Sequence, residues 1–186
     1  MNQLELFLSM LCGQFDNKIQ LEKFKMEGIT NYPFAEHRNT LCNDRIIGLP
    51  NDFTGAFVLK ESNYTFKGKT NYMPHLFLIT EEQTAIKLVS YEMPDGYTEE
   101  NFSYENLTSI KYTDLKLNET FTPIQFKWKN GCFYGKSVSM ISSNMKFRFE
   151  ETLTAERLLV SETIEVNGKR TFGFDLPIVY RRCESC

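Results

Sequence analysis

The fold is decided by the stretch Ile124-Gln125-Phe126-Lys127-Trp128-Lys129-Asn130-Gly131-Cys132-Phe133-Tyr134-Gly135. On both sides of Asn130-Gly131, apolar and polar side chains alternate with the period of two that is typical of a β-strand. Asn-Gly is a strong signal for a two-residue hairpin turn, because both residues tolerate the positive φ that such a turn requires. The stretch therefore predicts an antiparallel hairpin with strands over 124–129 and 132–138.

The same pattern of short β-branched and aromatic runs separated by turn residues continues from Pro33 onward. Asn167-Gly168 repeats the hairpin signal. The predicted strands cover 34–41, 44–48, 55–63, 75–80, 85–91, 124–129, 132–138, 145–152, 158–165, 170–174 and 178–182. Residues 95–106 are polar and rich in Tyr, with a short helical turn expected at Glu99-Glu100, and residues 107–123 are expected to be irregular.

The first part of the chain has a different pattern. Leu4, Phe7, Leu8 and Leu11 recur at helical spacing and predict a helix over 3–11. A second helix, capped by Asp16 or Asn17, is expected to run to about Met26 and to end at Gly28.

About ten antiparallel strands in one small domain need a way to hide their edges, and closing the sheet into a barrel does so. We therefore predict an all-β, mainly antiparallel barrel with N-terminal helices, one of which can plug an end of the barrel. No repeat or linker divides the chain, so residues 1–182 are expected to form a single domain and residues 183–186 a C-terminal tail.

Composition and charge exclude several classes of protein. A net charge of −3 and a pI near 5.5 argue against a nucleic-acid binder. No apolar run reaches the roughly 18 residues of a membrane helix, and the first residues lack a basic signal flank, so we expect a cytoplasmic protein without a membrane partner. Of the 5 cysteines, only Cys183 and Cys186 are close together. A solvated tail is the expected role of this pair, since a zinc site needs about four ligands.

Two strands present one charged and one aromatic face. In 145–151, Lys146, Arg148 and Glu150 alternate with Phe147 and Phe149, and 124–129 shows the same split. Two interpretations are open: the charged faces are solvated outside the barrel, or they line a ligand cavity in which Arg binds carboxylates and Glu accepts from N–H groups.

No catalytic constellation competes with a binding role. His37 and His75 do not have the spacing of a metal site, and each is expected to be a polar strand residue; no metal is expected. Nucleotide-binding and nucleophile-elbow motifs are absent from the sequence.

The segment Gly13-Gln14-Phe15-Asp16-Asn17-Lys18-Ile19-Gln20 resembles the G-x-F-x-N-x-x-Q opening of the CpcT/CpeT family of T-type phycobiliprotein lyases. Weaker similarities follow in the family's order, over roughly residues 5–182. They comprise Pro33 and His37, the 57–64 strand with Glu61, Gly131 to Gly135, Glu150 in an "S-E" strand, 167–173 and Tyr180-Arg181-Arg182. The family's "P-Y-R-x-R" is replaced by 71–75, where Met73 and His75 stand in place of the arginines, and its "W-D-R-G" by 160–163.

This resemblance implies a lipocalin-like (calycin) barrel and a bilin lyase that acts as a chaperone-like attachment factor. The implied substrate is an open-chain bilin rather than a permanent cofactor. It would be passed to a cysteine of an apo-phycobiliprotein β-subunit as a thioether. The divergence and the AT-rich residue usage suggest a cyanophage-encoded or marine cyanobacterial protein and favour phycoerythrobilin over phycocyanobilin. A bilin reductase as a further partner and a homodimer are hypotheses from the same resemblance.

The resemblance also nominates site residues. Glu150 is the first choice, and Glu61 the second, for a carboxylate that contacts the bilin nitrogens. The other candidates for bilin binding are the basic anchors Arg148, Lys146 and Arg181, the aromatic residues Tyr64, Trp128 and Tyr72, and His75. No cysteine of the lyase is required, and Cys132 is expected to be a buried structural thiol. Three alternatives stay open: a calycin carrier without transfer activity, an S-type lyase, and an interaction protein with a filled barrel.

Overall fold

The hairpin at Asn130-Gly131 forms as predicted, in a computed structural model that describes residues 2–183. The two flanking strands, β8 (Ile124–Lys129) and β9 (Cys132–Met140), pair antiparallel. Both turn residues have positive φ, 51° at Asn130 and 81° at Gly131. Asn167-Gly168 turns in the same way, with φ of 51° and 75°.

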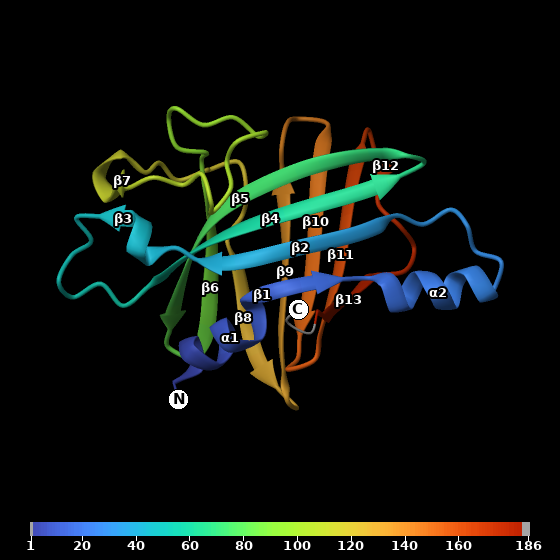
Figure 1. The fold of residues 1–186 in the computed structure, drawn as a ribbon, viewed down its shortest axis with the longest axis horizontal. Helices are drawn as coiled ribbons and strands as arrows, with labels where there is room; N and C mark the ends of the chain where they lie inside the picture. Colours follow the sequence, from blue (N-terminus) through green and yellow to red (C-terminus); the bar gives the residue numbers. More distant parts are fainter. Residues whose placement is uncertain (1, 184–186) are drawn as a thin grey trace.

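Ten strands form a closed antiparallel ring (Figure 1), in the order β10, β9, β8, β6, β5, β4, β2, β1, β13 and β11, with β11 pairing back to β10. Besides β8 and β9, the ring contains β1 (Gly13–Asp16), β2 (Phe34–Leu41), β4 (Ala56–Phe66), β5 (Lys69–Glu82), β6 (Ala85–Tyr91), β10 (Met145–Leu153), β11 (Arg157–Val166) and β13 (Ile178–Arg182). The short β12 (Lys169–Phe172) lies outside the ring and shares one edge of β11 with β13. The predicted all-β, lipocalin-like barrel is confirmed.

The first helix, α1 (Gln3–Leu11), closes one end of the barrel. Figure 1 shows it beside the lower ends of β6 and β8. The ring of Phe7 is fully buried there, 4.9 Å from Phe126 and 5.1 Å from Phe133. Aromatic contacts of this kind add to the burial of apolar area, so the predicted plug is an apolar core that joins the helix to β8 and β9.

Arg182 at the end of the last strand holds the end of α1. Its guanidinium donates hydrogen bonds to the carbonyl oxygens of Ser9 (3.0 Å), Met10 (2.9 Å) and Cys12 (2.6 Å). It also lies 4.7 Å from the ring centroid of Phe15. A cation at a helix C-terminus satisfies unpaired carbonyls and interacts favourably with the helix dipole.

The second helix, α2 (Lys18–Met26), begins differently from the prediction for Asn17. The buried side chain of Asn17 makes no cap hydrogen bond; it donates to Pro33 O (3.0 Å) and accepts from Ala35 N (2.9 Å). Asp16, the other predicted cap, accepts from the first backbone N–H of the helix at 3.0 Å. Beyond the end of α2, Gly28 adopts a φ of 76°, as the sequence predicted.

A second apolar cluster lies outside the ring. Phe57 and Leu76, on the outer faces of β4 and β5, pack with Phe102, Leu107 and Ile110 of the long connection that follows β6. This connection contains β7 (Ile110–Lys111), which pairs in parallel with β3 (Ile46–Ile47). The outer surface of β4 and β5 is therefore covered by protein.

Several predicted elements were wrong in this outer layer. The predicted strand 44–48 is mostly a 3-10 helix, η1 (Asn43–Arg45), followed by the two residues of β3. Residues 107–123, expected to be irregular, contain β7 and a second 3-10 helix, η2 (Tyr112–Asp114). Residues 99 and 100, by contrast, lie in the expected single helical turn, which is closed by hydrogen bonds from the backbone N–H groups of Asn101 (3.1 Å) and Phe102 (3.0 Å) to Thr98 O.

Candidate functional site: the barrel lumen

The inward faces of the strands follow from what packs on them. On β10, Leu153 is fully buried in the cluster around α1, and the period of two then directs Glu151, Phe149 and Phe147 inward as well. The intervening residues of the strand therefore point away from the lumen.

This orientation contradicts the cavity interpretation of the charged face of β10. Arg148 and Glu150 are exposed on the outer surface, and Arg148 Nε donates to Glu165 Oε1 at 3.0 Å. Lys146 shares this face. The cavity interpretation is therefore wrong for these three residues. Their side chains point outward because Leu153 and the other apolar residues of β10, which alternate with them, point inward. A bilin contact by these residues stays a prediction without support from the geometry.

The lumen is accessible to solvent from the end opposite α1. Along β10, exposure rises from the fully buried Leu153 to the partly exposed Phe149. Along β5, it rises from the fully buried Ile79 to His75, which is exposed although it lies on the inward face. The barrel is therefore closed at α1 and open at the other end.

Polar side chains from two opposite walls of the barrel face the middle of this lumen, and we call them the lumen belt. They come from β2, β4, β5, β10 and β11 and comprise His37, Lys60, Ser62, His75, Glu151 and Glu162. Strand register places His37 opposite Ser62 and Lys60 opposite His75. The belt joins residues from distant parts of the sequence.

Several belt atoms have no protein partner. Within residues 2–183, both ring nitrogens of His37 and the hydroxyl of Ser62 are buried and make no hydrogen bond to protein. The His37 ring instead lies between aromatic rings, 4.4 Å from Tyr180 and 5.1 Å from Phe15. A buried polar group without a partner costs about 1–3 kcal/mol, so this wall of the lumen is suited to a ligand with polar groups.

Glu151 is the buried acid of the belt, with 5% of its surface exposed. Burial raises the pKa of its carboxyl to about 7; the nearby Lys60 opposes this rise, and Glu162 adds to it. The carboxyl of Glu151 therefore exchanges its proton near neutral pH and can either accept or donate a hydrogen bond.

The two belt histidines stay neutral. Burial, helped by the charge of Lys60, lowers the pKa of His75 to about 4 and that of His37 well below its usual value. His75 is accessible to solvent, but protein atoms surround it on most sides, which explains the low pKa. Among the belt side chains, Lys60 is the cation whose charge acts on both histidines and on Glu151.

Two buried tyrosines are hydrogen-bonded to the belt. Tyr180 OH donates to Tyr64 OH at 3.2 Å, and Tyr64 OH donates to Glu162 Oε2 at 3.3 Å. Burial raises the pKa of Tyr64 well above its usual value, so the hydroxyl keeps its proton. Tyr64 and His75 are the two predicted site residues that lie at the lumen.

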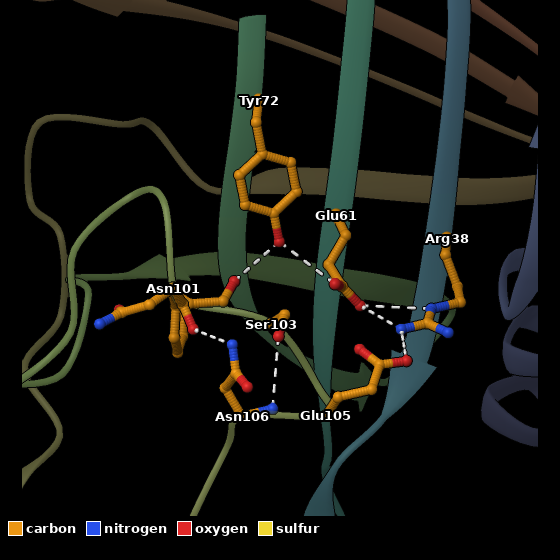
Figure 2. Close-up of polar contacts among 8 residues, drawn as sticks. Arg38, Glu61, Tyr72, Asn101, Ser103, Glu105 and Asn106 are labelled. Atoms are coloured by element: carbon orange, nitrogen blue, oxygen red, sulfur yellow. Dashed lines mark hydrogen bonds and ion pairs between the residues drawn. The ribbon is translucent and has the colours of Figure 1, made fainter.

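Glu61 and Tyr72 lie elsewhere, in an outer groove of about 390 Å³ over β1, β2, β4 and β5. Figure 2 shows their contacts: Tyr72 OH lies 3.2 Å from Glu61 Oε1 and 2.9 Å from Phe102 O, and Arg38 Nη2 is 3.1 Å from Glu61 Oε2. Arg38 also pairs with Glu105 of the covering connection. The carboxylate of Glu61 is thus already paired with a cation, outside the lumen.

The remaining predicted residues are also separate from the lumen belt. Trp128 packs on Phe133 near the closed end, with ring centroids 4.7 Å apart, and is 39% exposed. Arg181 is exposed on the outer face of β13. Cys132 was expected to be buried but is half-exposed, and its thiol lies 3.2 Å from Lys129 O. Cys186 lies outside the described residues.

Sequence reasoning missed Lys60, Glu151 and Glu162. Lys60 and Glu151 are next to Glu61 and Glu150, which the motifs emphasised, and lie on the opposite faces of their strands; Glu162 lies within 160–163, which was noted only as a departure from the family's motif. The signal was the phase of the alternation: Glu151 shares its phase with Phe149 and Leu153, whereas Glu150 does not.

Two further properties concern only residues 2–183. In this part of the chain, no helix has the length and apolarity needed to cross a membrane. Nor does it contain a group of three or more His, Cys, Asp or Glu side chains arranged to hold a metal ion.

Comparisons with known proteins point to one fold. No protein-family model and no curated protein matches the chain. Among solved structures, it is similar to the T-type phycobiliprotein lyase CpeT from Prochlorococcus phage P-HM1, with a TM-score of 0.59 and 12% sequence identity. The match covers 99% of this chain and 100% of the other. The chain thus has the fold of this T-type phycobiliprotein lyase along almost its whole length.

Proposed function

We propose that the protein is a T-type phycobiliprotein lyase, which binds an open-chain bilin in the lumen and delivers it to a cysteine of a phycobiliprotein β-subunit. The observation that carries this proposal is the open lumen with its belt of polar groups, one cation and one buried acid among aromatic walls. The fold that the chain shares with the phage lyase supports the same assignment.

The lumen belt offers groups that match the chemistry of a bilin. A bilin carries two propionates, four pyrrole-type nitrogens and a conjugated apolar frame. Lys60 would bind a propionate through charge-assisted hydrogen bonds. Glu151, with a pKa of about 7, would contact the ring nitrogens. Phe77, Phe147 and Phe149 are partly exposed on the inward face and would cover the rings.

The proposed reaction adds a thiol of the acceptor across the ethylidene double bond of the bilin. The sulfur bonds to one carbon of this double bond, and a proton is added to the other, so nothing is oxidised or reduced. The lyase contributes binding and orientation. Its own Cys12 and Cys42 are poor nucleophiles, because burial raises their thiol pKa values to about 11 and about 12.

Spectroscopy tests the binding step. The purified protein is mixed with phycoerythrobilin and, separately, with phycocyanobilin, and absorption and fluorescence are compared with those of the free pigments. We expect a sharpened, red-shifted band, strongest with phycoerythrobilin. Spectra identical to those of both free pigments would remove the bilin proposal.

A second experiment separates a lyase from a carrier without transfer activity. The carrier alternative is favoured by one observation: Met73 and His75, at the place of the family's arginines, supply no positive charge at neutral pH. The bilin-loaded protein is incubated with an apo-phycobiliprotein β-subunit and then denatured. Colour that stays on the β-subunit identifies a lyase, and colour that is lost on denaturation identifies a carrier.

A further inference from the structure

The outer surface of β8, β9 and β10 carries charged residues that the lumen does not use. We call it the β8–β10 face; it comprises Lys127, Lys129, Tyr134, Lys136, Val138, Met140, Lys146, Arg148 and Glu150. We propose that this face docks an acidic protein surface, that of the acceptor phycobiliprotein. The choice of acceptor rests on the proposed function above.

Strand register makes this face continuous. Lys127 lies opposite Tyr134, and Val138 lies opposite Arg148. Met140 is paired in the same way with Lys146. Because side chains of paired residues on one face are about 5 Å apart, a cation lies beside Tyr134 on the β8 side and beside Val138 and Met140 on the β10 side.

The charge of the face opposes that of the whole chain. Five of its residues are cations and one, Glu150, is an acid, whereas the chain carries a net charge of −3. Arg148 forms an ion pair with Glu165, whereas the four lysines of the face form none within residues 2–183, although strand register places Lys146 opposite Glu165 and Lys136 opposite Glu150. Binding of an acidic surface would reduce the electrostatic repulsion among these lysines. The positive charge of the face would also attract such a surface before contact.

Exposed apolar side chains lie on β9, the middle strand of this face. Tyr134 is 37% exposed, Val138 45% and Met140 56%. An apolar centre with a charged rim is the usual anatomy of a protein–protein interface. A nucleic acid would gain nothing from Val138 and Met140, whereas apolar side chains of a protein surface can pack against them, so a protein partner fits better.

Charge reversal tests the docking face without bilin. The variant carries Lys127→Glu, Lys129→Glu and Lys136→Glu. The control carries the same change at Lys25, Lys69 and Lys111, three exposed lysines on other elements. Binding of each protein to immobilised apo-phycobiliprotein β-subunit is measured at low salt and at about 1 M salt, where charges are screened beyond about 3 Å.

We expect the face variant to bind at least about tenfold more weakly than the wild type at low salt, the control to bind as the wild type does, and the difference to vanish at high salt. Equal binding by the wild type and the face variant, or no binding by the wild type, overturns the inference. So does a preference for duplex DNA or anionic vesicles, or wild-type self-association that the reversal abolishes. Thermal melts check folding, and the triple Lys→Gln variant replaces a reversal that fails to fold.

The experiment separates the two proposals. Complex formation is measured on bilin-free protein, so absent bilin spectra would not affect it. Conversely, failure to dock at this face leaves the spectroscopic test of the lumen intact.

Discussion

Adjacent acids on β10 occupy opposite environments. Glu150 is exposed on the outer face, whereas Glu151 is 5% exposed and points into the lumen. A shift of one residue reverses the face of every side chain in a strand, so the two form a matched pair for experiments. The same substitution at either position changes the same charge in a different solvent environment.

The first prediction concerns the pH dependence of stability. The folded-state pKa of Glu151 is raised from 4.5 to about 7. The protonated carboxyl therefore leaves the unfolding free energy undiminished below pH 4.5. As the pH rises from 4.5 through 7, the unfolding free energy falls by about 3 kcal/mol for such a shift. Glu151→Gln should remove this loss, so its unfolding free energy relative to the wild type should increase by about this amount between those pH values, measured by urea unfolding.

The other groups of the belt require a difference measurement. Because the pKa values of His37 and His75 are lowered, these residues make the protein less stable as the pH falls below 6.5, which is the opposite of the effect of Glu151. Lys60 and Glu162 are the other charged residues of the belt. Subtracting wild-type from variant free energies at each pH cancels most of these contributions. Glu150→Gln is the control and should show no such pH dependence; a similar curve for both variants would contradict the assignment.

The second prediction concerns Lys60 as the cation of the belt. If Lys60 binds a propionate, Lys60→Met should weaken bilin binding by about tenfold or more, since a hydrogen bond to a charged group contributes about 1.5–3 kcal/mol. Lys111→Met, at an exposed position of β7, is the control and should leave the affinity unchanged. Fluorescence titration measures both, and equal affinities would exclude Lys60 from the site.

The sequence predicted the alternation of these strands but not its phase. In β10, each face contains chemically reasonable residues, and the motif match drew attention to Glu150. The phase depends on Leu153, which packs in the cluster with α1, a helix far away in the sequence. For Glu61, the decisive contact is the ion pair with Arg38 under a covering connection that no local pattern reveals.

At the level of elements, Arg182 adds a polar attachment to the apolar core that joins α1 to the barrel. Arg182 makes three hydrogen bonds to carbonyl oxygens near the end of the helix. Arg182→Met should lower the unfolding free energy by about 2–3 kcal/mol. The adjacent Arg181 is exposed, and Arg181→Met should change it by less than about 0.5 kcal/mol. Urea unfolding compares them, and equal effects would show that the contacts of Arg182 do not hold the helix.

The hairpin between β4 and β5 supplies a further prediction. Its turn, Lys67-Gly68, has φ of 50° and 76°, and a lysine is strained in this region. Lys67→Asn should stabilise the protein by about 0.5–1 kcal/mol, because Asn tolerates positive φ better. Asn130→Lys, at the equivalent place of the β8–β9 turn, should destabilise by a similar amount. Thermal melts of both variants check the pair, and shifts in the same direction would contradict it.

The same turn explains where element prediction succeeded and failed. Both Asn-Gly turns were found from the sequence, and the strands beside Asn130-Gly131 begin where expected. Lys67-Gly68 carries a weaker turn signal, so β4 and β5 were predicted as 55–63 and 75–80 and extend beyond these bounds. The strand β1 was missed because its four residues gain their conformation from pairing with β2 and β13.

At the level of the whole molecule, closure of the ring was predictable because antiparallel strands without a cover must hide their edges. If the lumen binds a bilin, ligand at 100 times its dissociation constant should raise the unfolding free energy by about 2.7 kcal/mol. Melting with and without phycoerythrobilin measures this, and Lys60→Met should show a smaller gain at the same bilin concentration. No gain for the wild type would contradict binding to the folded barrel.

The closed end at α1 has a consequence for any long guest. Because the lumen opens at one end only, a long ligand enters and leaves through the same opening, and the part that enters first leaves last. If a chain of four rings enters lengthwise, one terminal ring lies deepest in the lumen, and the other lies at the opening, where a second protein contacts it first. The direction of entry thus decides which of two chemically similar ends of a pigment stays accessible at the opening, even where no side chain distinguishes them.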